Sequence, residues 1–532
     1  MERHTDSRKF PSALLFALFF LLLFVLHIPL LRLPYFWDEA GYYVPAARDL
    51  LLSGTLIPRS TPSNAHPPLV MALLALAWKV AGYTPVVTRT VMLLIAAFSL
   101  LGVFQLARRI ANTEVAVAST ICTAFYPVFF TQSSLAQVDL AAAGLIFWGL
   151  FAYVENRRWT AAVWFSLAVL TKETAVLAPV ALFGWELVAS FPIAGRFQQP
   201  RAPKRLFSHQ LSLLLPLIPL TLWYVFHYSR TGFVFGNPEF LRYNVQATLQ
   251  PLRILLALGL RLWQTFGYLN LYLLTLTASF AMWLPPVSDA GQERPRIDWI
   301  TQFAFLAVIV AYVLAMAVVG GAVLARYMLP AIPLVIIICV STLRRRVRQW
   351  RWIVGVVAIA FVAAVLVNPP YGITLEDNLA YRDYILLHEQ AEDFLEARYP
   401  MARVLTAWPA SDELTRAYLG YGTRPMRVFR IEDFTVEQLI AAADLRSNFD
   451  VALVFSTKYE PAHPWFERWQ TWRKWKTQLF GYHRDVPPAT AAQILGGRLV
   501  YEDRRNGQWV GVIEMEQVQE AMYPLKPGMP GK

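Results

Sequence analysis

Residues 10–31, FPSALLFALFFLLLFVLHIPLL, form a predominantly apolar run of 22 residues near the N-terminus. An α-helix needs roughly 20 such residues to span the hydrocarbon core of a bilayer. Basic residues precede the run, as they also do in a cleaved signal peptide, but no small-residue cleavage site follows it. We therefore expect a first transmembrane helix whose N-terminus lies in the cytoplasm.

The composition extends this interpretation to most of the chain. Hydrophobic residues make up 56% of the 532 residues and charged residues only 16%, where a soluble protein carries roughly 25% charged residues. Ten further apolar runs bring the predicted number of spans to eleven, so the expected fold is a mostly α polytopic membrane helix bundle. The further runs cover 86–107, 113–131, 138–154, 159–171, 173–190, 211–229, 264–285, 300–319, 327–343 and 351–367.

The charges divide the chain into two predicted domains. Residues 1–367 carry 29 Lys and Arg against 14 Asp and Glu, whereas residues 368–532 carry 19 against 22. With the N-terminus inside, 18 of those 29 basic residues fall on the cytoplasmic side and 11 outside, as the positive-inside rule requires. An odd number of spans then places residues 368–532 outside. The net charge of +12 reflects this multi-pass topology in the inner (plasma) membrane and not a nucleic-acid partner.

Two kinds of short apolar segment interrupt the pattern of full spans. Pro67–Val80 and Leu252–Trp263 lie in the two long outward loops and are too short to cross, so we expect helices along the outer membrane surface. The short runs 159–171 and 173–190 predict two half-buried helices that meet at a site near Lys172.

Few acidic residues face outward, and acidic groups beside hydrocarbon are costly unless they are functional or paired. Asp38, just after the first helix, could be functional or could cap a helix over Glu39–Leu52. Asp139, at the start of the fourth span, leaves the same two interpretations open. The six outward acidic residues are Asp38, Glu39, Asp49, Asp139, Glu173 and Glu239.

Five short motifs follow one another on the outward side: Trp37-Asp38-Glu39-Ala40-Gly41-Tyr42-Tyr43, His66-Pro67-Pro68-Leu69, Asp139, Leu170-Thr171-Lys172-Glu173 and Arg326-Tyr327-Met328-Leu329-Pro330. In this order the chain resembles the GT-C superfamily of membrane glycosyltransferases, in particular the bacterial branch of protein O-mannosyltransferases and the lipid A aminoarabinose transferase. The resemblance covers roughly residues 10–345. It implies an inverting enzyme that takes a sugar from a polyprenyl-phosphate carrier on the outer (periplasmic) face and passes it to a hydroxyl acceptor.

The resemblance also implies roles for single residues. An alcohol is a weak nucleophile, so a carboxylate must accept its proton in the transition state. By resemblance, Asp38 is that base or orients the acceptor, and Asp139 is the second acidic residue of the site. The leaving group is a phosphate anion, which cationic side chains stabilise. Arg326 and Lys172 are the candidates for this role, with Tyr327 as a hydrogen-bond donor.

The other motif residues each keep more than one interpretation. Glu39 assists the base or pairs with a basic neighbour. His66 binds the acceptor or the phosphate, or it fixes its own loop. Tyr42 and Tyr43 stack on sugar, line a lipid groove or belong to the interfacial aromatic belt. Glu173 departs from the small Gly common after the Lys in relatives, which leaves this junction without an assigned role.

Residues 368–532 alternate strand-like and helix-like stretches, which predicts an α/β domain with a small parallel or mixed sheet. The Trp-rich stretch Trp465–Trp475 predicts a helix that packs on the membrane part, lies on the membrane or binds glycan. No catalytic set stands out, so we expect acceptor recognition or support of a lid. The predicted strands cover 403–408, 426–431 and 449–455, with helices at 412–419 and 436–445 and a hairpin at 499–501 and 509–513.

No cofactor is expected, because the sequence shows no Asp-x-Asp, no His/Cys metal spacing and no phosphate-binding Gly loop. The outward carboxylates could still bind a divalent cation. The expected partners are a polyprenyl-phosphate-sugar donor, a protein, lipid or glycan acceptor, and membrane lipid. Two alternatives to an enzyme remain: a transporter or flippase of a lipid-linked sugar, and a non-catalytic envelope assembly scaffold. The lack of matched halves and the one-sided acidic residues favour the enzyme.

Overall fold

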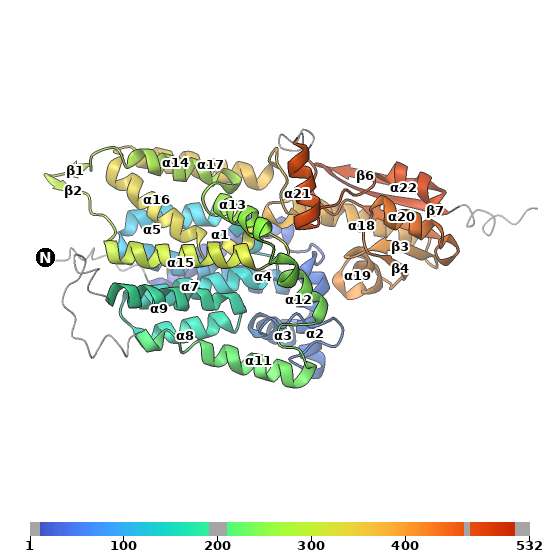
Figure 1. Ribbon diagram of the computed structural model, residues 1–532, viewed down its shortest axis with the longest axis horizontal. Helices are drawn as coiled ribbons and strands as arrows, with labels where there is room; N and C mark the ends of the chain where they lie inside the picture. The colour runs from blue at the N-terminus through green and yellow to red at the C-terminus, as the bar shows by residue number, and fades with distance from the viewer. Residues whose placement is uncertain (1–10, 191–209, 462–468, 516–532) are drawn as a thin grey trace, which may run out of the picture. The chain divides into compact units, whose positions relative to one another are not determined.

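A computed structural model describes residues 11–190, 210–461 and 469–515 of the chain (Figure 1). Three parts of the sequence predictions therefore lie outside the described residues. These are the basic N-terminal tail, the basic connection Arg196–Arg205 and the first residues of the Trp-rich stretch.

The chain forms two compact units. The first comprises Met1–Leu31 and Tyr42–Val367, and the second comprises Arg32–Gly41 and Asn368–Lys532. The sequence analysis had placed residues 32–41 in the first domain. The structure groups this short segment, which carries Asp38, with the C-terminal unit instead.

The first unit is built almost entirely of helices, as its apolar runs predict, and many of them run parallel or antiparallel to one another (Figure 1). It also contains a short hairpin of two strands. These elements are α1 (Ser12–His27), α2 (Val44–Ser53), α3 (Leu69–Ala81), α4 (Pro85–Ile110), α5 (Thr113–Phe125), α6 (Pro127–Gln132), α7 (Val138–Val154), α8 (Arg158–Val169), α9 (Leu177–Ser190), α11 (Leu217–Thr231), α12 (Pro238–Asn244), α13 (Pro251–Phe266), α14 (Leu271–Ala281), β1 (Ser288–Asp289), β2 (Gln292–Glu293), α15 (Trp299–Val318), α16 (Ile332–Arg346) and α17 (Trp350–Leu366).

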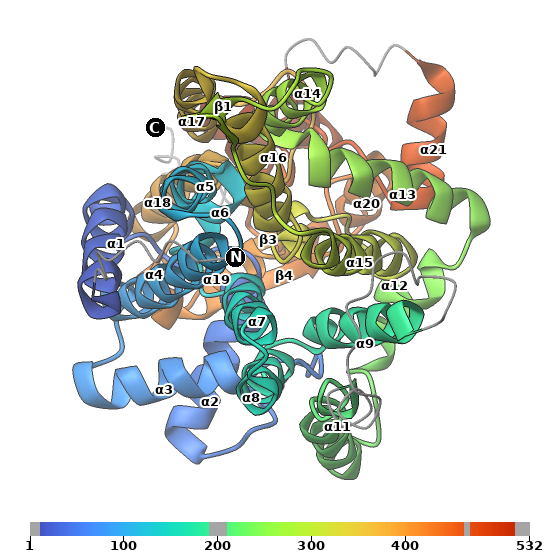
Figure 2. The same cartoon turned by 90° about the vertical axis from the view of Figure 1, so that its left-hand side faces the viewer.

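Helix α4 is central to the packing of this unit. It packs against α1, α5 and α7, while α7 packs against α8 and α9 packs against α15. Figure 2, which views the bundle end-on, shows α1 at its left edge and α11 at the bottom. Thr84 caps α4 by accepting a hydrogen bond from the Val87 backbone N–H at 3.3 Å, and Pro85 occupies the first turn, where its missing N–H costs nothing.

Five of the described helical segments are long and apolar enough to cross a membrane, by length and composition. They are Ser12–Leu30, Pro85–Ile110, Glu173–Ser190, Gln210–Thr231 and Trp299–Val318. Four shorter apolar helices, α3, α5, α7 and α17, have 10–17 residues each. Helices occupy each of the eleven predicted ranges, but the count of eleven crossings stays a prediction.

The predicted surface helix Leu252–Trp263 and the predicted span 264–285 correspond to two separate helices, with a shifted boundary. Helix α13 continues to Phe266, and α14 begins at Leu271. Leu269 and Asn270 have φ angles of 48° and 71°, in the left-handed region that an α-helix does not contain. The Asn270 side-chain amide donates a hydrogen bond to the Ala360 carbonyl oxygen at 2.9 Å. A hydrogen bond to a distant helix therefore accompanies this interruption of the helical backbone.

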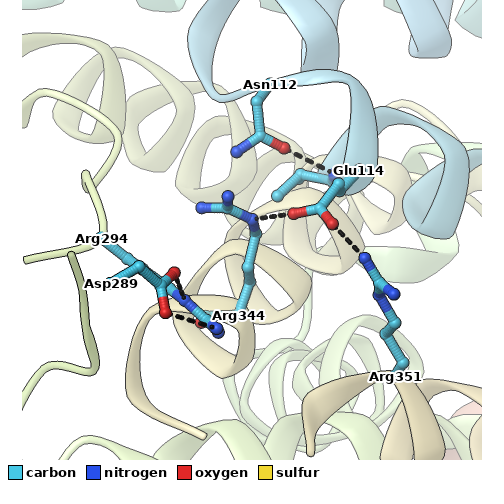
Figure 3. Close-up of polar contacts among 7 residues, drawn as sticks. Asn112, Glu114, Asp289, Arg294, Arg344 and Arg351 are labelled. Carbon is cyan, nitrogen blue, oxygen red and sulfur yellow. Dashed lines mark hydrogen bonds and ion pairs between the residues drawn. The ribbon is translucent and has the colours of Figure 1, made fainter. Parts of the chain in front are cut away.

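Three of the described connections that are predicted to be cytoplasmic meet at one end of the bundle. The β1–β2 hairpin lies at this end, and α2, α3 and α12 lie at the other (Figure 1). Glu114 accepts hydrogen bonds from Arg344, at 2.7 Å, and from Arg351 (Figure 3). Arg294 binds Asp289 at 2.7 Å and the Arg344 carbonyl oxygen at 2.8 Å. Three connections distant in sequence are thus tied together.

The second unit alternates strands and helices around one sheet. Its strands are β3 (Arg403–Ala407), β4 (Arg427–Ile431), β5 (Val451–Phe455), β6 (Gly497–Arg505) and β7 (Gln508–Met515). Its helices are α18 (Ala380–Arg398), α19 (Ala410–Thr415), α20 (Val436–Ala443), α21 (Gln470–Phe480) and α22 (Pro488–Leu495). The strand order is β4-β3-β5-β7-β6, in which β3 pairs parallel with β4 and β5, and β7 pairs antiparallel with β5 and β6.

The strand patterns explain this order. Every residue of β5 is buried, as expected for a central strand covered on both faces. Asn506 and Gly507, with φ angles of 45° and 84°, form the two-residue turn between β6 and β7, because such turns need left-handed residues at both positions. The predicted strands at 403–408, 426–431 and 449–455 correspond to β3, β4 and β5.

Candidate active site

Asp139 lies in the first turn of α7 and is only 3% exposed. Its Oδ1 atom lies 2.5 Å from the Nζ atom of Lys172. Lys172 has an extended backbone between α8 and the 3-10 turn Glu173–Val176, so the predicted junction of two short helices is real. The helix break lets the lysine reach the start of a neighbouring helix, 33 residues earlier in the chain.

Arg326 approaches the same carboxylate from a third segment. It belongs to the 3-10 turn Ala325–Met328, is 2% exposed, and places its Nε atom 3.3 Å from Asp139 Oδ2. Its Nη1 atom donates a hydrogen bond to the side-chain oxygen of Gln137, the residue before α7. Asp139, Lys172 and Arg326 therefore form one buried cluster. Together with Arg261, which is described below, these residues are called here the cationic cluster.

Tyr327 supplies an aromatic face to this cluster. The Lys172 Nζ atom lies 4.0 Å from the centre of the Tyr327 ring, and the guanidinium carbons of Arg326 and Arg261 lie 5.7 Å and 5.5 Å from it. These distances are typical of cation–π contacts. The contacts observed here involve the Tyr327 ring, so the predicted role of its hydroxyl group as a donor stays a prediction.

Arg261 is a member of the cationic cluster that the sequence analysis missed. It is fully buried, and its guanidinium donates to the Met316 and Leu324 carbonyl oxygens and to the Gln264 side chain at 2.7–3.1 Å. Its Nη2 atom has no hydrogen-bond partner among the described residues.

A signal for Arg261 was present in the sequence. The buried residues of α13 include Arg253, Ala257 and Arg261, spaced four apart on one helix face, while Leu255 and Leu262 are exposed. A helix with cations inside and leucines outside is inverted relative to a helix of a soluble protein. This arrangement suits a helix that contacts lipid on one face and a polar interior on the other.

His66 pairs with Glu173. The His66 Nδ1 atom lies 2.8 Å from Glu173 Oε2, which gives a role to the glutamate that the sequence analysis left unassigned. Tyr43 stacks on the His66 ring at 6.0 Å between centroids, and Tyr42 meets it edge-on at 6.4 Å. Burial raises the pKa of Tyr42 above its ordinary value of 10, so its hydroxyl stays protonated.

The loop before His66 is fixed by contacts with distant segments. Ser63 lies 2.8 Å from the His227 ring nitrogen Nε2, and the Trp223 indole N–H donates to the Ala65 carbonyl oxygen at 2.8 Å. Ala65 has a φ of 60°, an uncommon conformation for a residue other than Gly. Both proposed roles for His66 remain compatible with this geometry, because the loop is held by its neighbours as well as by His66.

Asp38 and Glu39 lie in the second unit. Glu39 is fully buried, and its Oε2 atom accepts a hydrogen bond from the Phe36 backbone N–H at 2.9 Å. A π-helical turn over Glu39–Tyr43 follows, and Trp37 has a left-handed φ of 48°. Such strained conformations persist only where the surroundings impose them, often at functional sites. The helix predicted over Glu39–Leu52 thus begins as this turn and continues as α2.

The C-terminal part of the second unit holds the segment that carries Asp38. Phe36 meets Tyr384 edge-on with ring centroids 5.3 Å apart, and Trp37 meets Trp408 at 5.0 Å. A Cβ atom at Gly41 would lie 2.9 Å from the Trp408 ring, so only Gly fits there without a shift. The segment follows α1 in sequence, yet the C-terminal unit determines its conformation.

The comparisons with known proteins agree on one class. Residues 65–223 match the family model for dolichyl-phosphate-mannose-protein mannosyltransferase. The fold is similar to that of ArnT from Cupriavidus metallidurans bound to undecaprenyl phosphate, with a TM-score of 0.55 and 13% identity over 94% of this chain and 97% of that chain. The apo state of ArnT gives a TM-score of 0.51 and 14% identity over the same shares of both chains.

An archaeal relative extends the comparison. The oligosaccharyltransferase AglB from Archaeoglobus fulgidus, in complex with an inhibitory peptide and a dolichol-phosphate, matches with a TM-score of 0.50 and 12% identity over 94% of this chain and 74% of that chain. No curated protein sequence matches this chain. The family model covers the part of the chain that contains His66, Asp139 and Lys172. Together with the shared fold, it confirms the resemblance to the GT-C membrane glycosyltransferases, enzymes that use sugars carried on lipid phosphates.

Proposed function

We propose that the protein is an integral-membrane inverting glycosyltransferase. It moves a sugar from a polyprenyl-phosphate carrier to a hydroxyl acceptor on the outer, periplasmic face of the inner membrane. The observation that carries this proposal is the cationic cluster, in which Lys172 and Arg326 pair with the single carboxylate of Asp139 and the buried Arg261 lies over the same Tyr327 ring.

The charge of the cationic cluster suits the phosphate of the donor. Burial of charge is costly unless the charge is balanced, and three cations with one carboxylate leave an excess of positive charge. A phosphate group would balance it, and an arginine can bind a phosphate through two parallel hydrogen bonds. Lys172 and Arg326 would also stabilise the negative charge that develops on the phosphate oxygen as the bond to the sugar breaks.

Asp38 is proposed as the residue that activates the acceptor. In this reaction the acceptor oxygen forms a bond to C1 of the sugar while the bond from C1 to the phosphate oxygen breaks. The hydroxyl proton passes to the Asp38 carboxylate, and the polyprenyl phosphate leaves with the electron pair. Attack from the face opposite the phosphate inverts the configuration at C1. The assignment of Asp38 rests on its motif, which the second unit holds in a constrained conformation.

The relatives support a donor carried on a lipid phosphate. ArnT binds undecaprenyl phosphate, and AglB binds a dolichol-phosphate. Both are similar to this chain over 94% of its length. The AglB complex also contains a peptide. Of the three acceptor classes, protein is therefore the one to test first.

The substitution Asp38→Asn tests the proposal, because it removes the proton acceptor with almost no change in shape. Labelled lipid-linked sugars extracted from the membranes serve as donors, and transfer to membrane acceptors is the readout. General-base catalysis contributes on the order of 10²–10⁴-fold, so we expect a loss of that size with unchanged protein level. Asp444→Asn, at an exposed carboxylate of the second unit, should transfer at the wild-type rate. Full activity of Asp38→Asn would remove Asp38 from this role.

The same material separates the two alternatives. A flippase would move the lipid-linked sugar across proteoliposome membranes without covalent change to any acceptor. A scaffold would tolerate substitutions of Asp38 and Arg326 but would lose function when residues 368–532 are deleted. The proposal expects covalent transfer of the sugar in the first assay and loss of function from the Asp38 and Arg326 substitutions in the second.

A further inference from the structure

A second cluster of ionisable side chains lies in the core of the C-terminal unit. His388 and Glu392 lie one helical turn apart on α18, so they project from the same helix face. Glu413 comes from α19. One possible ligand atom from each residue lies within 4.8 Å of those of the other two, and each residue is only 1% exposed. His388, Glu392 and Glu413 are called here the acidic cluster.

The polar atoms of the acidic cluster are poorly satisfied. The His388 Nδ1 atom lies 2.6 Å from Glu413 Oε2. By contrast, His388 Nε2, Glu413 Oε1 and both carboxylate oxygens of Glu392 have no hydrogen-bond partner among the described residues. No described lysine or arginine forms an ion pair with either glutamate. An uncompensated buried carboxylate is costly, so the acidic cluster needs either a bound cation or a proton.

We propose that His388, Glu392 and Glu413 bind one divalent cation of the zinc class. One imidazole nitrogen and two carboxylates are the ligand types of zinc and related transition metals, whereas calcium and magnesium prefer oxygen ligands alone. Zinc bonds of about 2.0–2.2 Å to nitrogen and oxygen place tetrahedral ligand atoms roughly 3.4 Å apart. A small inward movement of the three side chains would therefore close the site.

The surroundings of His388 fix the orientation of its ring. Tyr384 stacks on it with centroids 3.8 Å apart, and Phe455 meets it edge-on at 4.5 Å. Tyr384 also packs against Phe36 and Trp37, in the segment that carries Asp38. A metal ion bound here would brace this segment from within the second unit. The inference stands on these contacts and does not depend on the transfer reaction.

A proton is the competing occupant of the acidic cluster. Burial and the neighbouring Glu413 carboxylate raise the pKa of Glu392 above its ordinary value of 4.5. Without a metal ion, this shift favours the protonated, neutral form of Glu392. The test must distinguish a bound metal ion from a protonated acid.

Zinc binding to the full-length protein in detergent provides this test. Elemental mass spectrometry measures the metal content as purified, and thermal unfolding is then followed after chelation and titration with zinc chloride. We expect about one zinc ion per chain and a rise in melting temperature when zinc is restored, since a ligand of the folded state stabilises it. Glu392→Gln should bind zinc at least about 100-fold more weakly.

Asp393→Asn is the matched control, because it removes an exposed carboxylate from the next position of α18 and should bind zinc as the wild type does. If Glu392→Gln fails to fold, the visible spectrum of the cobalt-loaded wild type replaces it and should show tetrahedral coordination. A wild-type protein that contains no metal, and whose melting temperature zinc does not change, would overturn the proposal in favour of a protonated acid. Equal zinc affinity of wild type and Glu392→Gln would overturn it too.

Discussion

The two units of the protein each bury a cluster of charged side chains, and the two clusters have opposite compositions. In the cationic cluster of the first unit, Lys172 and Arg326 pair with the carboxylate of Asp139, and Arg261 lies over the same Tyr327 ring as they do. In the acidic cluster of the second unit, Glu392 and Glu413 share one imidazole, that of His388. In the first cluster the basic side chains outnumber the carboxylate, and in the second the carboxylates outnumber the imidazole.

The sign of the unbalanced charge indicates what each cluster can bind. Water solvates an exposed excess of charge at little cost, but a buried excess must find a counter-ion or change its protonation. The cationic cluster can be completed by an anion such as the phosphate of a lipid carrier. The acidic cluster can be completed by a cation. The following predictions begin with a variant of a buried group in the cationic cluster, where the largest effect is expected. They end with a variant of a more exposed group, where the smallest effect is expected.

Among the variants that compare the two clusters and their surroundings, the largest effect is expected where a cation is removed from the cationic cluster. Arg326→Gln keeps a polar side chain but removes one charge that would stabilise the leaving phosphate. Loss of one such preorganised donor typically lowers the rate on the order of 10²–10³-fold, so kcat/KM for sugar transfer should fall by that amount. Steady-state kinetics with the lipid-linked donor measures it.

Arg344→Gln is the control for this variant. Arg344 is an arginine in an ion pair with Glu114 at the other end of the bundle (Figure 3), so transfer should stay at the wild-type level. Equal losses in Arg326→Gln and Arg344→Gln would mean that the effect is structural and that the cationic cluster has no special role.

A smaller effect is expected at a pair that is already balanced. His66 and Glu173 form a half-buried pair at 2.8 Å, so His66→Gln and Glu173→Gln should each lower transfer about tenfold by loosening the same loop. Groups in direct contact couple by roughly 0.5–3 kcal/mol, so the double variant should be no worse than the worse single variant. Fully additive losses in this double-mutant cycle would show that the two side chains act separately.

A packing change should have a moderate effect without altering any charge. Gly41→Ala places a methyl group 2.9 Å from the Trp408 ring and should loosen the segment that carries Asp38. We expect transfer to fall several-fold and limited proteolysis of this segment to become faster. Gly355→Ala, where a Cβ meets nothing within 4 Å, should change neither. Normal proteolysis of Gly41→Ala combined with normal transfer would contradict the role given to the second unit.

The smallest effect is expected at a partly exposed carboxylate of the second unit, that of Glu396. Glu396 accepts hydrogen bonds from the Thr423 and Arg424 backbone N–H groups and the Thr423 hydroxyl, and these lower its pKa below 4.5. The stability it contributes is present above pH 4.5 and is lost as pH falls through the lower folded-state pKa. Glu396→Gln should cost about 1 kcal/mol or less at pH 7, because solvent screens the site.

Thermal unfolding of the full chain between pH 3 and pH 7 measures this cost. The difference between Glu396→Gln and the wild type should shrink as the pH falls. Glu437→Gln, an exposed position on α20, should match the wild type throughout. A difference that grows toward low pH would contradict the sign of the pKa shift.

The sequence predicted the parts of the site that motifs mark. Asp139, Lys172 and Arg326 are distant in sequence, and only the order of the motifs indicated that they meet. The sequence alone could not show that Lys172 and Arg326 contact different oxygen atoms of the Asp139 carboxylate. That contact depends on the break between α8 and α9, which brings the lysine to the start of α7.

Other residues were missed because their partners are distant. Glu173 looked like a departure from a pattern until His66, 107 residues earlier, proved to be its partner. His388 and Glu392 have the i, i+4 spacing of two ligands on one helix. In the sequence, however, the strand β3 lies between them and Glu413. Only the folded α/β unit brings the third residue to the other two.

Two details of the fold depend on distant contacts in the same way. The break at Leu269 and Asn270 lies a few residues beyond the predicted boundary between 252–263 and 264–285 and is accompanied by a contact with Ala360, 90 residues away. The segment 32–41 follows a transmembrane run and was assigned to the first domain, yet its aromatic residues pack against α18 and Trp408. Local patterns predict helices and strands well but do not specify which unit a short connection joins.

Mass spectrometry of the glycoconjugates at the cell surface tests the central claim most directly. Membranes from cells that contain the wild-type protein are compared with membranes from cells that contain Asp38→Asn at the same level. We predict that a protein, lipid or glycan carries an added sugar mass in the first sample and lacks it in the second. Identical glycoconjugates in the two samples, alongside transport of a lipid-linked sugar by both proteins, would contradict the account.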